Sequence, residues 1–183
     1  SDIEITANLS ITDGISTREI HNILIRSAND LISEEAPNYQ YVAARLLLYS
    51  LRKDVWGESE PPRLYEHIVK LVDAGIYDKR LIEKYTESEI HKIGKFINHK
   101  RDEVFTYCGI QQLVDKYLIK NRKTGQTYET PQFAYIAIAM VLFSNYPKKV
   151  RLDYIKKAYT YLSTFKISLP TPIMSGVRTP IYQ

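Results

Sequence analysis

The chain has 183 residues, 44% of them hydrophobic, which is enough to bury a core as one domain, or one domain plus a small appended piece, without disulfides. Its 25 basic and 21 acidic residues are interspersed and leave a net charge of +4, so the clustered basic face that a nucleic-acid partner requires is missing. No apolar run approaches the ~20 residues of a membrane helix. The N-terminal segment SDIEITANLS lacks a signal-peptide pattern. We therefore expect a cytoplasmic protein without a membrane segment.

The first half of the sequence predicts amphipathic helices with clear boundaries. Ser16 and Glu19 have capping-box spacing and open a helix that ends before Pro37. A second helix follows Asn38 and stops before Gly57, and the two helices should pack as a pair. Further helices are predicted from Pro61-Pro62 to Gly75, over 79–84, after a second capping box at Thr86 and Glu89, and from about Val104 to Tyr117.

The second half begins with LIKNRKTGQTYE, residues 118–129, which predicts a small two-stranded hairpin around Thr124-Gly125. Pro131 then opens QFAYIAIAMVLF, the most apolar segment, which we expect to be the central core helix. Residues 148–165 predict another amphipathic helix. Its inward face should consist of Val150, Tyr154, Ala158 and Leu162.

The last segment, ISLPTPIMSGVRTP at 167–180, contains two closely spaced prolines. Pro170 and Pro172 argue against a helix and favour an extended edge strand. One strand cannot bury itself, so its partners should come from later sequence or from another polypeptide. Thr171 is held between the prolines, and this rigid backbone makes its hydroxyl a candidate contact for a phosphate.

The remaining reactive residue types favour structural roles. The four histidines show no i, i+4 pair of the kind that binds a metal on a helix, and we predict no metal site. Cys108 is the only cysteine, so no disulfide is possible within the chain, and it should be a buried small hydrophobe. Glycine-rich phosphate loops are absent from the sequence. Aromatic packing in the core should explain Tyr49, Tyr135, Tyr154 and Tyr161.

Several segments, in order along the chain, together resemble one known family. The most specific is STFKISLPTPIMSGVRTP at 163–180. It is supported by APNYQYVAARL at 36–46, LRK at 51–53, KYLIKNRKTGQTYETPQF at 116–133 and LFSNYP at 142–147. With these motifs the chain resembles the N-terminal portion of the large, catalytic alpha subunit of class I ribonucleotide reductase, the aerobic enzyme that reduces ribonucleoside diphosphates.

The resemblance implies a domain organisation. In that family a regulatory ATP-cone precedes a helical region, and a ten-stranded α/β barrel with the active site follows. Residues 1–56 would be the C-terminal part of an incomplete ATP-cone-like region, 57–166 the helical domain, and 167–183 the first strand of the absent barrel. The expected fold is therefore mainly α, an orthogonal helical domain with one small β-hairpin and a C-terminal extended strand that pairs with the missing barrel.

The resemblance also implies site residues and partners. The positions matching Thr17, His21 and Lys53 lie at the effector nucleotide, and the threonine matching Thr171 contacts the substrate near its phosphates. The effectors would be ATP and dATP, and the partners a radical-generating small subunit and the rest of the large subunit, in cis or in trans. The redox cysteines of the family have no counterpart here, so we expect no catalytic residue and no cofactor within this chain.

Two functions are compatible with these observations. The first is a portion of the reductase, from a split gene or a longer chain, that is inactive alone and contributes Thr171 to the substrate site. The second is a non-catalytic nucleotide-binding or protein-interaction helical module, which the absence of the reactive cysteines would also explain. Nucleotide binding and recovery of reductase activity with the missing portion distinguish the two.

Overall fold

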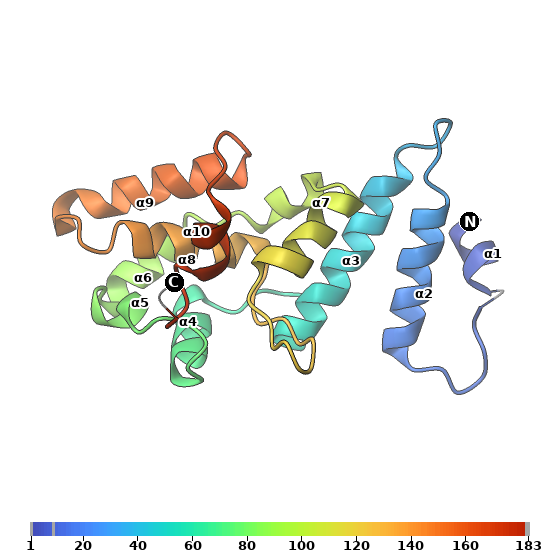
Figure 1. Cartoon of the computed structure of the whole chain (residues 1–183), viewed down its shortest axis with the longest axis horizontal. Helices are drawn as coiled ribbons and strands as arrows, with labels where there is room; N and C mark the ends of the chain where they lie inside the picture. Colours follow the sequence, from blue (N-terminus) through green and yellow to red (C-terminus); the bar gives the residue numbers. More distant parts are fainter. Residues whose placement is uncertain (1, 9, 182–183) are drawn as a thin grey trace.

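The computed structural model describes residues 2–8 and 10–181, and helices dominate this part of the chain. The molecule is elongated, with α1 and α2 at one end and α5 and α6 towards the other (Figure 1). No described helix combines the length and apolar composition needed to cross a membrane. The elements are α1 (Asp2–Asn8), α2 (Thr17–Asp30), α3 (Tyr39–Trp56), α4 (Leu64–Asp73), α5 (Arg80–Glu83), α6 (Glu87–Gly94), η1 (His99–Val104), α7 (Tyr107–Gln112), η2 (Leu113–Tyr117), α8 (Pro131–Leu142), α9 (Lys148–Ser163) and α10 (Thr171–Gly176).

Local capping signals correctly predicted where α2 begins and where α3 begins and ends. Ser16 and Glu19 form the predicted capping box of α2, and each accepts a hydrogen bond from the other's backbone N–H. Asn38 is the N-cap residue of α3, but its side chain makes no capping hydrogen bond. Gly57 ends α3 in the left-handed region, with φ of 81°, which a residue without Cβ adopts without strain. Helix α3 packs against α2 on one side and against α7 on the other (Figure 1).

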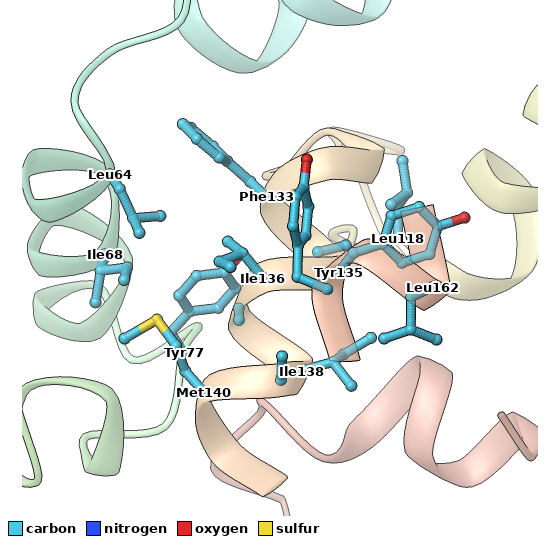
Figure 2. Close-up of a cluster of buried hydrophobic side chains, with 14 of the residues drawn as sticks. Leu64, Ile68, Tyr77, Leu118, Phe133, Tyr135, Ile136, Ile138, Met140 and Leu162 are labelled. Atoms are coloured by element: carbon cyan, nitrogen blue, oxygen red, sulfur yellow. The ribbon is translucent and has the colours of Figure 1, made fainter. Parts of the chain in front are cut away.

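Helix α8 is the centre of the hydrophobic core, as its sequence predicted. Pro131 occupies its first turn, where the missing N–H costs no intrahelical hydrogen bond. Every residue from Pro131 to Val141 is buried. Figure 2 shows Phe133 and Ile136 projecting from α8 on the side where Leu64 and Ile68 of α4 lie, while Tyr135 projects from another side of α8.

The predicted inward face of α9 was correct at Leu162, which is buried, and at Ala158, which packs against the core, but wrong in the first half of the helix. Val150 and Tyr154 are 40% and 45% exposed, whereas the buried residues are Arg151, Ile155, Tyr159, Leu162 and Ser163. Arg151 faces inward because its guanidinium donates to Glu89 at 2.6 Å and lies 4.3 Å from the centre of the Tyr85 ring. A charge with such partners can occupy a core position that the hydrophobic pattern alone assigns to an apolar residue.

The predicted hairpin at 118–129 was also wrong, because this segment forms only an isolated antiparallel bridge between Lys120 and Thr127. The turn closes through the Gly125 N–H, which donates to the Asn121 carbonyl at 2.8 Å. Pairing extends no further because the Ile119 N–H donates to the Glu129 carboxylate at 2.8 Å and not to a strand partner.

The C-terminal strand was the third incorrect prediction. Residues Thr171–Gly176 form the short helix α10, and Pro170 precedes it in an extended conformation with ψ of 148°. Pro172 lies in the first helical turn, where its fixed φ and absent N–H are compatible with a helix start. Two prolines this close therefore mark the beginning of a helix here. The last two residues of the predicted strand, 182 and 183, lie outside the described residues.

Candidate functional site

The first candidate site is the face that α2 and α3 present beside one another. The His21 ring on α2 lies edge-on to the Tyr49 ring on α3, with centroids 5.4 Å apart and an interplanar angle of 80°. Lys53 Nζ lies 5.4 Å from the centroid of the same Tyr49 ring. Two of the three predicted effector residues, His21 and Lys53, therefore converge on one aromatic side chain.

Thr17, the third predicted effector residue, lies at the start of the same face. It is the first residue of α2, is exposed, and precedes His21 by four positions, so both side chains lie along one side of the helix. At this end of the pair, the Arg18 guanidinium contacts the Asp54 carboxylate at 2.6 Å. This ion pair links the start of α2 to the end of α3.

Tyr49 is the residue of this face that the sequence did not predict. The sequence assigned Tyr49 to the core, but its side chain is 41% exposed. Its i, i+4 spacing to Lys53 was the available signal, because these positions share one side of a helix. Tyr49 supplies an aromatic surface with a cation on one side and an imidazole on the other, which suits a nucleotide.

The second candidate site surrounds Thr171 at the start of α10. Thr171 is exposed, and its hydroxyl has no hydrogen-bond partner among the described residues. Its carbonyl accepts a hydrogen bond from the Ser175 hydroxyl at 2.8 Å within α10. The Thr171 side chain is therefore available to a ligand, while its backbone belongs to an ordered turn.

A fully buried arginine anchors α10 to the helical core. The Arg178 guanidinium forms a salt bridge with Glu129, to which its Nε donates at 2.9 Å. Arg178 also donates to the Met174 carbonyl at 2.6 Å and to the Tyr117 carbonyl at 2.9 Å. Most of its donors are thereby satisfied, as a charge without access to water requires.

Glu129 receives further hydrogen bonds from the core. The Tyr77 hydroxyl donates to it at 2.6 Å, and the Ile119 N–H donates at 2.8 Å. Burial, together with the Glu129 charge, raises the pKa of Tyr77 well above its usual value, so Tyr77 stays protonated and remains a donor. This network holds the backbone of α10 at Met174, three residues after Thr171, and no local sequence pattern indicated it because its partners are far apart along the chain.

The other reactive residues lie elsewhere. Cys108 is exposed, so its predicted burial was wrong: α7 is short and turns its Ile110 side to the core. His67 and His99 are largely enclosed, and burial lowers the pKa of each to about 4. His91 contacts Glu87 at 3.2 Å. Within the residues that the structure describes, no cluster of three or more His, Cys, Asp or Glu side chains is placed to hold a metal ion.

Comparison with known proteins agrees with the helical fold. Residues 103–182 match the family model described as "Ribonucleotide reductase, all-alpha domain". This assigns the second half of the chain to a class of helical domain found in ribonucleotide reductases.

Curated relatives extend the similarity to the whole chain. The chain is 54% identical over all 183 residues to ribonucleoside-diphosphate reductase 1 subunit alpha of Escherichia coli (strain K12). It is 50% identical over 183 residues to subunit alpha of Haemophilus influenzae, and 49% identical over 173 residues, 94% of the chain, to subunit alpha of Enterobacteria phage T4. The chain spans 24%, 24% and 23% of these relatives, respectively. Over its whole length the chain is thus similar to ribonucleoside-diphosphate reductase alpha subunits, of which it spans about a quarter, and this similarity confirms the predicted resemblance.

Proposed function

We propose that this chain is the N-terminal portion of the large subunit of a class I ribonucleoside-diphosphate reductase, an oxidoreductase that makes deoxyribonucleotides for DNA synthesis in the cytoplasm. The observation that carries this proposal is that all 183 residues of the chain align with alpha subunits, at 54% identity to that of Escherichia coli (strain K12). The redox chemistry would use cysteines outside these 183 residues, since Cys108 is exposed and has no second cysteine beside it. The portion would act with the rest of the large subunit and with a radical-generating small subunit.

Within this function Thr171 would contact the substrate near its phosphates. Its exposed hydroxyl and its place in the first turn of α10 support this role, and the buried Arg178–Glu129 pair would hold the turn in position. The division into an ATP-cone-like part (1–56), a helical part (57–166) and a segment of the barrel (167–183) remains a proposal. The contacts of α10 with η2 support packing of residues 171–176 on the helical part.

Reconstitution tests the proposed enzyme. The chain would be mixed with a polypeptide carrying the remaining portion of the subunit and with the small subunit, and reduction of cytidine diphosphate would be measured. We expect a complex on size-exclusion chromatography and recovered reduction. Thr171→Ala should raise KM about tenfold, the effect of one lost hydrogen bond to a charged group. Ser168→Ala replaces another exposed hydroxyl residue of the same segment and is the matched control. Failure to form a complex would refute the proposal.

We further propose that Thr17, His21 and Lys53 contact an effector nucleotide, ATP or dATP. Lys53 and His21 flank Tyr49, so the phosphates would lie near the lysine while the aromatic ring would support the base or ribose. Because these side chains are open to solvent, the remainder of the site would come from sequence preceding these residues in the longer subunit.

Calorimetric titration with ATP and with dATP tests this assignment. Lys53→Ala should weaken binding about tenfold through loss of a charge-assisted contact. Lys149→Ala, an exposed lysine on α9, should leave the affinity unchanged. Equal affinities of both variants would refute the effector role of Lys53. Nucleotide binding without recovered reductase activity would favour the alternative of a non-catalytic nucleotide-binding module, for which the lone exposed Cys108 is the supporting observation.

A further inference from the structure

A cavity whose lining shares no residue with the proposed effector face lies between α4 and α6. It has a volume of about 410 Å³ and is bordered by the start of α4 and the end of α6. These helices approach closely at its base, where a Cβ added to Gly94 would lie 3.3 Å from the Leu64 Cβ. The volume falls within the range of about 300–1,000 Å³ that is typical of small-molecule sites.

The charged side chains that line this cavity are both cations. They are Arg63 and Lys95, and the lining also contains the imidazole rings of His91 and His99 but no carboxylate. Arg63 and Lys95 are exposed, and neither forms an ion pair with any other residue that the structure describes. Their charges are therefore not compensated by the protein and are available to an anion.

The first-turn N–H groups of α4 and the His99 ring add hydrogen-bond donors to the cavity. Helix α4 begins at Leu64, and its N-cap residue Arg63 makes no side-chain capping hydrogen bond, so the first-turn N–H groups and the helix dipole are open to an anion at this wall. Nδ1 of His99 is buried and has no hydrogen-bond partner among the residues that the structure describes. Because burial lowers the pKa of His99 to about 4, its ring is neutral and can donate from one nitrogen.

One part of the cavity wall is apolar. Ile97 and Phe133 line it, and the Phe133 ring lies 5.1 Å from the His99 ring and 5.6 Å from the Trp56 ring, in edge-to-face arrangements. Phe133 is part of the buried core, so this wall is rigid. A ligand that filled the cavity would therefore need an anionic end and an apolar end.

We propose that this cavity binds a small organic phosphate, with the phosphate between Arg63 and Lys95 at the start of α4 and the apolar part against Ile97 and Phe133. A phosphate dianion can use two separate cations and a helix N-terminus together, which favours it over a singly charged carboxylate. The site is independent of the proposed effector face, and its existence does not require the proposed enzyme function.

Titration by two-dimensional NMR of the full chain tests the proposal, with phenyl phosphate, inorganic phosphate and phenol as the three probes. We expect phenyl phosphate to shift the amide signals of Leu64 and Gly94 with saturation, and to bind more tightly than inorganic phosphate. Phenol should not saturate these shifts. Signals of the Tyr49 region should not move with phenyl phosphate.

Variants identify the groups responsible. Arg63→Ala with Lys95→Ala should weaken phenyl phosphate binding by at least about tenfold. Lys92→Ala, an exposed lysine on α6 outside the cavity, is the matched control and should not alter the affinity. A thermal unfolding curve for each variant establishes that it is folded. Equal binding by the double variant, absence of saturable shifts at Leu64 and Gly94, or equal affinity for inorganic and phenyl phosphate would each overturn the proposal.

Discussion

Helix α2 and the region around α8 differ in how they are stabilised. Helix α8 buries all residues from Pro131 to Val141, whereas the 14-residue α2 buries only Ile25, Ser27 and Ala28. The continuous core includes residues from α3 to α9 and, among the described residues, none from α2. The proposed effector face thus lies where the thinly packed α2 meets α3, while α10 and Thr171 are anchored to the deeply packed region. Local opening should therefore be easier at α2 than around α8.

The largest loss of stability is expected when the buried Arg178–Glu129 salt bridge, which anchors the deeply packed region, is broken. Glu129→Ala leaves the Arg178 guanidinium buried without its counter-charge, and should lower the free energy of unfolding by about 3–5 kcal/mol. Urea denaturation measures this loss. Glu83→Ala, which removes an exposed ion pair with Lys79, should change the stability by less than about 0.5 kcal/mol. Equal effects of the two variants would contradict the anchoring role.

The next largest losses of stability are expected from substitutions that leave a cavity beside α8 or beside α2. Ile136→Ala, in fully buried α8, should cost about 2–5 kcal/mol of global stability. Ile25→Ala, on α2, should mainly speed hydrogen exchange of α1 and α2 amides and leave the exchange of α8 unchanged. Uniform acceleration of exchange throughout the chain by Ile25→Ala would show that the two regions unfold as one unit.

Acid should weaken the deeply packed region through its enclosed histidines. The folded pKa values of His67 and His99 are about 4, below the unfolded value of 6.5, so between these values the unfolded state binds more protons. Stability should fall as pH drops from about 6.5 to 4, by up to about 1.4 kcal/mol per pH unit for each histidine.

Asp102 acts in the opposite direction. Burial raises its pKa from 3.8 to about 6, so its contribution to stability increases as pH falls through that window. Urea unfolding at several pH values would measure the net slope. His67→Gln with His99→Gln should abolish the loss at low pH and reveal the opposing slope of Asp102. An unchanged slope in that double variant would contradict this assignment.

The smallest changes in stability are expected on removal of a capping box, a motif that occurs once in each of the two regions. Ser16→Ala on α2 and Thr86→Ala on α6 each remove a capping box, a change worth about 0.5–2 kcal/mol. Thr86→Ala should reduce global stability, because α6 packs on α4 and α9. Ser16→Ala should instead raise hydrogen exchange within α2 alone. Similar global losses in both variants would show that α2 is coupled to the core more tightly than its packing indicates.

The helical fold and most helix boundaries were predictable, because their signals act within a few residues. Both capping boxes, the left-handed Gly57 and the buried α8 were confirmed. The predicted strand at 167–183 failed because two prolines are compatible with either a strand edge or a helix start, and only contacts made by Arg178 to the core distinguish them.

The sequence by itself determined most of the helices, their caps and the family resemblance, because these depend on short-range spacing and on motifs. The tertiary structure decided which charges are buried: Arg178 reaches Glu129 from 49 positions away, and Arg151 reaches Glu89 from 62. It also decided that Tyr49 is exposed between His21 and Lys53. Burial of a charge or exposure of an aromatic ring depends on partners from other helices, and a hydrophobic pattern along one helix does not contain that information.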